Sequence, residues 1–210
     1  MSDIKLKSFI HSFLVVSVLL LGGCLGQEEA NHQSHTTSSE TPSYKRIFDP
    51  PKEAYAFNLT DQFGQRKGLN DWKGKIVVLG DIYTRCPVAC PILARCFVEI
   101  QDELGEMLFD QVVLVFVTVD PEYDTPEKLA TWTNAFNGKW VALTGTLEEC
   151  EEVWNNYGIV VYGESGEIGH SAKFTLIDQQ GMIRFDYYYP PESEQILNDI
   201  YALMGTVARL

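Results

Sequence analysis

The sequence predicts an α/β protein in which one mixed β-sheet is covered by helices. Two near-continuous apolar runs of strand length, at residues 75–83 and 111–120, suit strands that are buried on both faces. A segment with helical spacing of apolar residues follows each run, and the chain closes with a strand pair and a helix. With 210 residues and 45% hydrophobic content, the chain is long enough for one domain with a sizeable core.

The N-terminal residues 1–23 have the features of an export signal. Lys5 and Lys7 precede an apolar run that is shorter than the roughly 17–25 residues needed to cross a bilayer. The run ends in the sequence LGGC, which resembles the lipobox of prokaryotic lipoproteins and would make Cys24 the lipidated N-terminus of the mature protein. An uncleaved anchor and ordinary cleavage are the alternatives. Both the lipoprotein and the anchor would hold the domain at the cell membrane, outside the cytoplasm.

Residues 24–47 are polar and rich in Ser, Thr, Gln and Glu. Such a segment cannot bury enough apolar surface to offset its ordering entropy, so it predicts a flexible tether before a folded domain at 48–210. His32 and His35 lie in this tether. Solvated linker residues are the ordinary interpretation of this pair, and an accessory metal-binding pair is the alternative.

The first half of the domain shows a strand pattern at residues 55–59, a turn at 61–64 and the buried strand at 75–83. A helix is predicted over residues 92–108, whose apolar positions recur at helical spacing. They are Leu93, Phe97, Ile100, Leu104 and Leu108.

The second buried strand, at 111–120, leads to a helix with Thr125 as N-cap and Pro126 at its first position, ending near Phe136. A short strand is predicted at 140–143. One face of the next helix is apolar and consists of Leu147, Cys150, Trp154 and Tyr157.

The end of the chain predicts a hairpin and a helix. Strand patterns at 173–177 and 182–189 are joined by a turn that contains Gly181. An amphipathic helix is predicted from Ser193 to about Val207.

The charge of the chain excludes one class of function. Its formal net charge is -13, and no stripe of Lys and Arg is visible along the sequence. Because phosphate contacts need clustered basic side chains, we expect no nucleic-acid partner.

The stretch YTRCPVACPILARC, residues 83–96, places Cys86 and Cys90 where a buried strand meets a helix. If the helix begins at Cys86 or just after it, both thiols share one face at the helix N-terminus, where backbone N–H groups and the helix dipole lower thiol pKa values. Thiolates serve disulfide exchange and bind soft metals. A structural disulfide is the third interpretation, but it would close a very small loop and stabilise little.

His170 is the one histidine of the predicted domain, at the end of a glycine-rich loop that begins at Gly163. A lone histidine is ordinarily a surface or hydrogen-bonded residue. However, two thiolates and one imidazole suit Cu(I) and can also hold Cu(II), whereas Zn(II) would need a fourth ligand. Cys86, Cys90 and His170 are therefore a candidate copper site.

Four motifs, in order, resemble the Sco/SenC family of copper-binding proteins. They are FNLTDQFGQ with LNDWKGK, GKIVVLGDI with YTRCPVACP, TVDPEYDTPEKL, and GHSAKFTLIDQQG. The resemblance extends from about Tyr55 to the C-terminus. It implies a thioredoxin-like fold and a membrane tether. It also implies copper delivery to, or thiol maintenance in, the dinuclear copper centre of cytochrome c oxidase subunit II.

Carried over residue by residue, the resemblance makes Cys86, Cys90 and His170 the copper ligands and makes the two cysteines a redox-active pair. Asp120 and Asp124, in DPEYDTP, match an acidic loop of the family. A supporting role beside the ligands is open for Asp120, while Asp124 lies just before the helix N-cap.

Three residues fall outside the family pattern. Cys96 and Cys150 lie within predicted helices and are expected to be buried, inert thiols, although a bridge between them or with Cys86 or Cys90 stays open. Asp81 lies in an otherwise apolar strand, and the sequence does not show whether it is paired or solvated.

Two other functions compete with a copper carrier. A thiol-disulfide oxidoreductase would use the Cys86–Cys90 pair without needing His170, but GHSAKF carries no proline where such enzymes usually place one. A peroxidase that acts through Cys86 is the second competing function. The sequence therefore leaves open whether the protein is an enzyme.

Overall fold

The structure, a computed structural model, describes residues 44–164 and 167–205. The predicted signal peptide, Cys24, His32 and His35 lie outside the described residues. The strands are β1 (Lys45–Glu53), β2 (Asn58–Asp61), β3 (Arg66–Gly68), β4 (Ile76–Ile82), β5 (Val112–Thr118), β6 (Val141–Thr144), β7 (Val161–Glu164), β8 (Glu167–His170), β9 (Lys173–Ile177) and β10 (Met182–Tyr188). The helices are the 3₁₀ turn η1 (Leu69–Trp72), α1 (Ala89–Phe109), α2 (Pro126–Ala135), α3 (Leu147–Tyr157) and α4 (Ser193–Met204).

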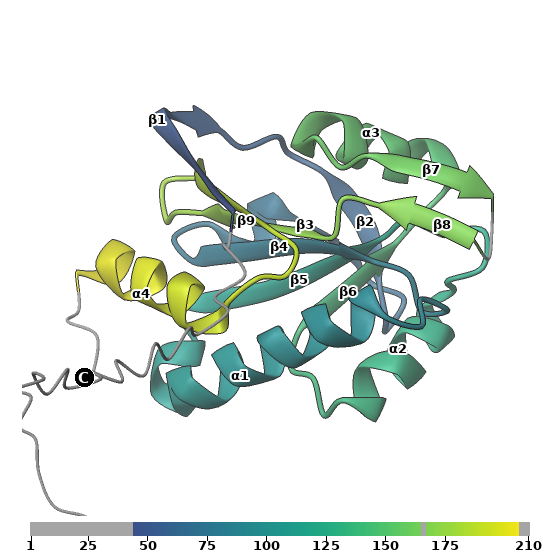
Figure 1. Cartoon of the computed structure of the whole chain (residues 1–210), viewed down its shortest axis with the longest axis horizontal. Helices are drawn as coiled ribbons and strands as arrows, with labels where there is room; N and C mark the ends of the chain where they lie inside the picture. Colours follow the sequence, from purple (N-terminus) through teal and green to yellow (C-terminus); the bar gives the residue numbers. More distant parts are fainter. Residues whose placement is uncertain (1–43, 165–166, 206–210) are drawn as a thin grey trace, which may run out of the picture. The chain divides into compact units, whose positions relative to one another are not determined.

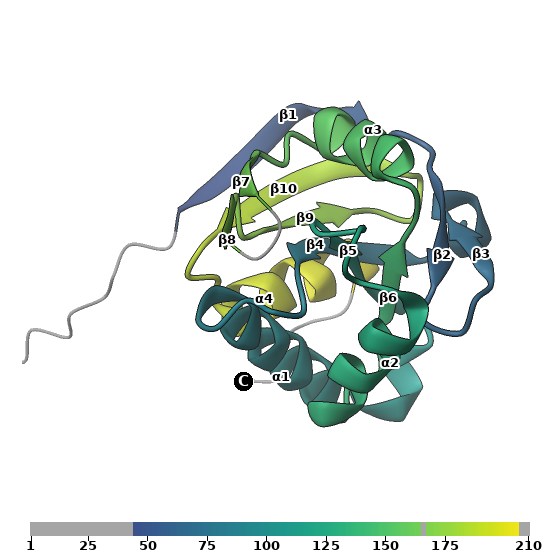
Figure 2. The ribbon, with the colours of Figure 1, turned by 90° about the vertical axis from the view of Figure 1, so that its right-hand side faces the viewer.

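Eight of these strands form one sheet in the order β1-β10-β9-β4-β5-β6-β2-β3, and β7 pairs with β8 in a separate ribbon. The pairs β4–β5 and β5–β6 are parallel and the remaining pairs of the large sheet are antiparallel. Helices α1, α2 and α4 cover one face, while α3 and the β7–β8 ribbon lie over the other (Figures 1 and 2). The predicted mixed α/β architecture is confirmed.

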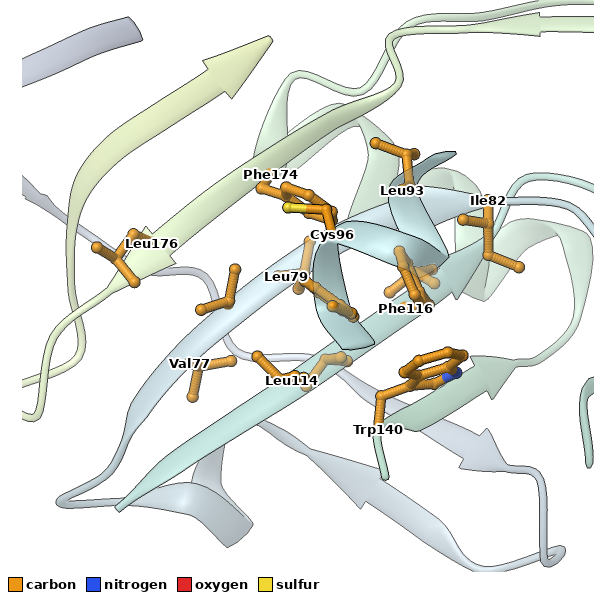
Figure 3. Close-up of a cluster of buried hydrophobic side chains, with 14 of the residues drawn as sticks. Val77, Leu79, Ile82, Leu93, Cys96, Leu114, Phe116, Trp140, Phe174 and Leu176 are labelled. Carbon is orange, nitrogen blue, oxygen red and sulfur yellow. The ribbon is translucent and has the colours of Figure 1, made fainter. Parts of the chain in front are cut away.

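The centre of the core is aromatic and lies between α1 and the sheet (Figure 3). The Phe97 ring stacks on Phe174 at 4.5 Å between centroids and lies 4.3 Å from Phe116. Gly80 makes this packing possible, because a Cβ at that position would lie 2.6 Å from the Phe174 ring. The tight packing fixes β4 against β9, the two strands that lead to the candidate site.

Several predicted elements are confirmed. The apolar runs become β4 and β5, the terminal hairpin becomes β9 and β10, and the last predicted helix becomes α4. This helix ends at Met204, before the predicted end near Val207, because Gly205 takes a left-handed C-cap conformation. Thr125 caps α2 by accepting a hydrogen bond from the Lys128 N–H, and Pro126 is its first residue.

Three predictions are corrected by the structure. The strand expected at 55–59 is β2, which begins at Asn58 because its pairing with β3 and β6 starts there. Strand β1 begins at Lys45, inside the segment predicted as a tether, because the backbone there pairs with β10. Its sequence has little alternation of apolar residues, so the strand was not predicted. The loop predicted from Gly163 to His170 is instead the β7–β8 ribbon, in which Val161 pairs with His170.

Within residues 44–164 and 167–205, no helix has both the length and the apolar character needed to cross a membrane.

Candidate metal centre

Cys86 and Cys90 lie on either side of the start of α1. The helix begins at Ala89 with Val88 as its N-cap, just after Cys86, so Cys86 lies in the turn before the helix and Cys90 lies in its first turn. The expected contact with helix N–H groups survives, since the Cys90 N–H donates to Cys86 Sγ at 3.3 Å. The Cys90 side chain is fully buried, and its sulfur accepts a hydrogen bond from the Tyr83 N–H at 3.4 Å.

His170 is the last residue of β8, and its side chain meets the two cysteines from a segment far away in the sequence. Its Nε2 lies 3.5 Å from Cys90 Sγ, and the sulfurs of Cys86 and Cys90 and a ring nitrogen of His170 all lie within 4.8 Å of one another. The structure therefore brings together the three residues that the sequence predicted as a site. Tyr83 packs edge-on against the imidazole, with 5.7 Å between ring centroids.

Asp81 lies behind His170 in the buried strand β4. Its Oδ2 is 2.5 Å from His170 Nδ1, and its two oxygens accept hydrogen bonds from the N–H groups of Ala172 and Lys173 at 2.9 and 3.1 Å. Asp81 is unusual in the sequence because it interrupts an apolar strand, but its partner could not be predicted. An acidic residue within a buried apolar strand is the signal that pointed to it, since a buried carboxylate needs hydrogen-bond donors.

The two thiols of the site differ strongly in acidity. Hydrogen bonding from Cys90 lowers the pKa of Cys86 to about 3, and His170 acts in the same direction. Burial and the hydrogen bond to Cys86 raise the pKa of Cys90 well above its ordinary range. The metal-free site therefore holds one thiolate, on the more exposed sulfur, and one thiol.

The imidazole is held in its charged form when no metal is bound. Burial of His170 opposes the charge, but the hydrogen bonds to Asp81 and Cys86 outweigh it and raise the pKa of His170 to about 9. A metal that binds Nε2 therefore displaces a proton from this ring.

A buried network holds the cysteine turn against the loop after β5. Asp124 is fully buried and accepts hydrogen bonds from the N–H of Thr84 at 3.1 Å and from the hydroxyls of Thr84 and Thr118 at 2.5 and 2.6 Å. Burial raises the pKa of Asp124 despite these bonds. Asp124 thus fixes Thr84, two positions before Cys86. The sequence had indicated only that Asp124 precedes the N-cap of a helix.

Asp120 lies outside the group of three. Its side chain is buried and accepts a hydrogen bond from the Arg85 guanidinium at 2.5 Å, next to Cys86 in the chain. The Arg85 guanidinium also lies over the Tyr123 ring, 3.8 Å from its centroid. A supporting role for Asp120 beside the ligands stays a prediction, and Arg85 is the contact through which it would act.

The two extra cysteines are core residues, as expected. Cys96 and Cys150 are buried free thiols, and burial raises the pKa of each to about 12. Cys96 lies among apolar side chains of the core in Figure 3. Neither belongs to the group formed by Cys86, Cys90 and His170.

The donor set fits a soft transition metal. Two sulfurs and one imidazole nitrogen match the preferences of Cu(I) and remain able to hold Cu(II), whereas tetrahedral zinc requires a fourth donor. In the described part of the chain, this is the one group of three His, Cys, Asp or Glu residues close enough to hold an ion.

The family model described as SCO1/SenC matches residues 48–205 of the chain. Protein sco1 of Schizosaccharomyces pombe is 31% identical over 139 residues, which cover 62% of this chain and 53% of that protein. The chain thus spans about half the length of that relative.

Three solved structures are similar in fold. A SCO1/SenC family lipoprotein from Bacillus anthracis has a TM-score of 0.66 and 30% identity, covering 73% of this chain and 97% of that one. Copper-bound ScoI of Bradyrhizobium japonicum has a TM-score of 0.64 and 26% identity, covering 72% and 99%. BsSco, described as a cytochrome c oxidase assembly protein with a disulfide switch, has a TM-score of 0.64 and 25% identity, covering 75% and 97%.

The fold and the site define a class: a thioredoxin-like α/β protein with a two-cysteine, one-histidine centre at the junction of β4 and α1. Within that class, the match over residues 48–205 shows that the chain belongs to the SCO1/SenC family.

The asymmetry of the two thiols can be tested by alkylation. Because the Cys86 thiol is ionised above a pH of about 3, its rate of reaction with iodoacetamide should stay nearly constant between pH 5 and 8. A thiol with the ordinary pKa of about 8.5 would react several-hundredfold to a thousandfold faster at the upper end of that range. Peptide mapping by mass spectrometry identifies the labelled cysteine.

Cys86→Ser is the control and should abolish labelling at pH 5. A rate for Cys86 that rises steeply with pH, or labelling of Cys90 before Cys86, would contradict the assigned asymmetry.

Proposed function

We propose that the protein binds copper through Cys86, Cys90 and His170 and carries it as cargo. The observation that carries this proposal is the convergence of two sulfurs and one imidazole nitrogen within 4.8 Å, from elements far apart in the sequence. The donor chemistry favours copper, and the similar ScoI of Bradyrhizobium japonicum is described as copper-bound. Membership of the SCO1/SenC family also supports copper binding.

The cellular role we propose is cytochrome c oxidase assembly, in which the protein delivers copper to the dinuclear copper site of subunit II or keeps the cysteines of that site reduced. The description of BsSco as an oxidase assembly protein supports the first part. The partial exposure of Cys86 supports a direct handover, because an incoming thiolate can approach a metal held partly by a half-buried sulfur. This role is that of a carrier rather than a turnover enzyme.

We further propose that the domain is attached to the outer side of the cell membrane through a lipid on Cys24. The LGGC sequence after a short apolar run supports this attachment. The similar protein of Bacillus anthracis is described as a lipoprotein.

Anaerobic titration of the full chain in detergent with copper tests the ligand set. The wild-type protein should bind one copper tightly and, with Cu(II), show a thiolate-to-copper charge-transfer band. Cys86→Ser, Cys90→Ser and His170→Ala should each abolish or strongly weaken this band, because each removes one of three donors.

The control is the double variant His32→Ala/His35→Ala, which removes the histidine pair of the predicted tether. Its copper affinity and spectrum should match those of the wild type. Unchanged Cu(II) affinity in His170→Ala, or undiminished affinity after the two cysteines are oxidised to a disulfide, would overturn the assignment.

A second function, thiol-disulfide exchange, is favoured by one specific observation. Cys86 is a half-exposed thiolate and Cys90 a buried thiol, as an attacking and a resolving cysteine should be. The Cys86 thiolate would attack a target disulfide, releasing one target thiolate. Cys90 would then lose its proton and attack Cys86, which releases the second thiolate and leaves a Cys86–Cys90 disulfide.

Variants separate the two functions in cells. For a copper carrier, His170→Ala should lower oxidase activity to the level of Cys86→Ser. If His170→Ala retains full oxidase activity while Cys86→Ser loses it, thiol exchange is the function that matters.

A further inference from the structure

Asp81 is a buried carboxylate whose known partners all belong to the segment that carries His170. Its side chain has no exposed surface, and it lies one residue beyond the Gly80–Phe174 pair of strands β4 and β9. Three N–H groups point to its two oxygens: those of the His170 ring, Ala172 and Lys173. Burying a carboxylate is costly, so three donors from one short segment bind that segment firmly to β4.

The geometry determines which nitrogen of His170 faces the cysteines. A carboxylate accepts hydrogen bonds, so the 2.5 Å contact makes Nδ1 the protonated nitrogen that donates to Asp81. The Ala172 N–H is closer to Asp81 Oδ2, at 2.9 Å, than to Nδ1, at 3.3 Å, so it donates to the carboxylate and Nδ1 does not have to act as its acceptor. Nε2, 3.5 Å from Cys90 Sγ, is left to offer its lone pair to a metal.

The backbone after His170 also depends on Asp81. Ala172 has a positive φ of 49°, a conformation that a residue with a Cβ rarely adopts. Its N–H donates to Asp81, and the chain turns there from β8 into β9. The same carboxylate thus holds both the ring of His170 and the turn that places this ring.

We propose that Asp81 is the positioning residue of the metal centre: it fixes Nε2 of His170 as the coordinating nitrogen and sets the ring orientation. The inference rests on the proposed copper function and names a residue that acts through His170 without contacting the metal. Partners of this kind typically change metal affinity 10- to 100-fold. The effect should be larger for Cu(II) than for Cu(I), because two soft thiolates suffice to hold Cu(I), whereas imidazole contributes more to Cu(II).

Asp81→Asn is the informative variant because it keeps the shape and removes an acceptor. With the amide oxygen toward His170, the NH₂ group faces the Lys173 N–H. With the amide turned around, the NH₂ group faces Nδ1 and favours the tautomer in which Nε2 carries the proton and cannot bind a metal. We expect Cu(II) affinity to fall about 10- to 100-fold and Cu(I) affinity to fall less.

Asp178→Asn is a matched control. Asp178 is also buried, accepts hydrogen bonds from two backbone N–H groups, those of Gln180 and Met182, and follows the opposite end of β9. Its loss should destabilise the fold comparably without changing Cu(II) affinity. If both variants lose Cu(II) affinity equally, Asp81 has only a structural role and the proposal fails.

A spectroscopic measurement on the wild-type protein tests the proposal even if Asp81→Asn does not fold. The protein is prepared with histidine labelled with ¹⁵N at Nδ1 only and loaded with one Cu(II) per chain. Pulsed EPR should show ¹⁴N as the directly coordinated nitrogen and ¹⁵N as the remote one. A directly coordinated ¹⁵N would overturn the proposal.

The outcomes separate this inference from the copper function itself. If His170→Ala weakens Cu(II) binding but Asp81→Asn does not, His170 is a ligand and only the role of Asp81 is wrong. If His170→Ala binds Cu(II) like the wild type, the ligand set of the proposed function fails, whatever Asp81→Asn does.

Discussion

The buried central strand β4 is the constraint on which the candidate site depends. It is fully buried between β5 and β9, it contains Asp81, and its C-terminal end leads directly to Tyr83 and the cysteine turn. Because Gly80 lies directly against the Phe174 ring, this strand cannot shift in its packing without steric overlap. The position of β4 therefore sets the positions of His170, through Asp81, and of Cys86 and Cys90, through the start of α1.

Buried polar groups hold the site together at a considerable desolvation cost. Asp81 and Asp124 are fully buried, and each accepts three hydrogen bonds. The donors to Asp81 belong to the segment of His170, and those to Asp124 belong to Thr84 and Thr118. Such carboxylates stabilise a structure only when every acceptor is used. The two aspartates therefore specify the geometry of a site whose own donors, two thiols and an imidazole, are few and separated in sequence.

For the proposed carrier function, the charges of the three candidate ligands favour exchange of the metal over permanent binding. Cys86 is already a thiolate, whereas Cys90 and His170 retain protons that a metal must displace. A carrier has to release its cargo, and protons that return to Cys90 and His170 compete with the metal. The same arrangement would also support thiol exchange, so the two proposed activities draw on one set of acidities.

Sequence reasoning predicted the buried strands, the capped helix α2 and the three candidate ligands, because apolar runs, cap residues and chemically distinctive side chains are local signals. It left the exact start of α1 open and missed the β7–β8 ribbon, since these depend on how the chain packs around Cys86 and on pairing of Val161 with His170. The partner of Asp81 lies 89 residues away and no local pattern reveals it.

X-ray absorption spectroscopy at the copper edge, on protein loaded with one Cu(II) per chain, can test directly whether Cys86, Cys90 and His170 are the copper ligands. We expect two sulfur neighbours and one imidazole, with the imidazole scattering lost in His170→Ala and one sulfur lost in each cysteine variant. A copper surrounded only by nitrogen and oxygen, or imidazole scattering that persists in His170→Ala, would contradict this assignment.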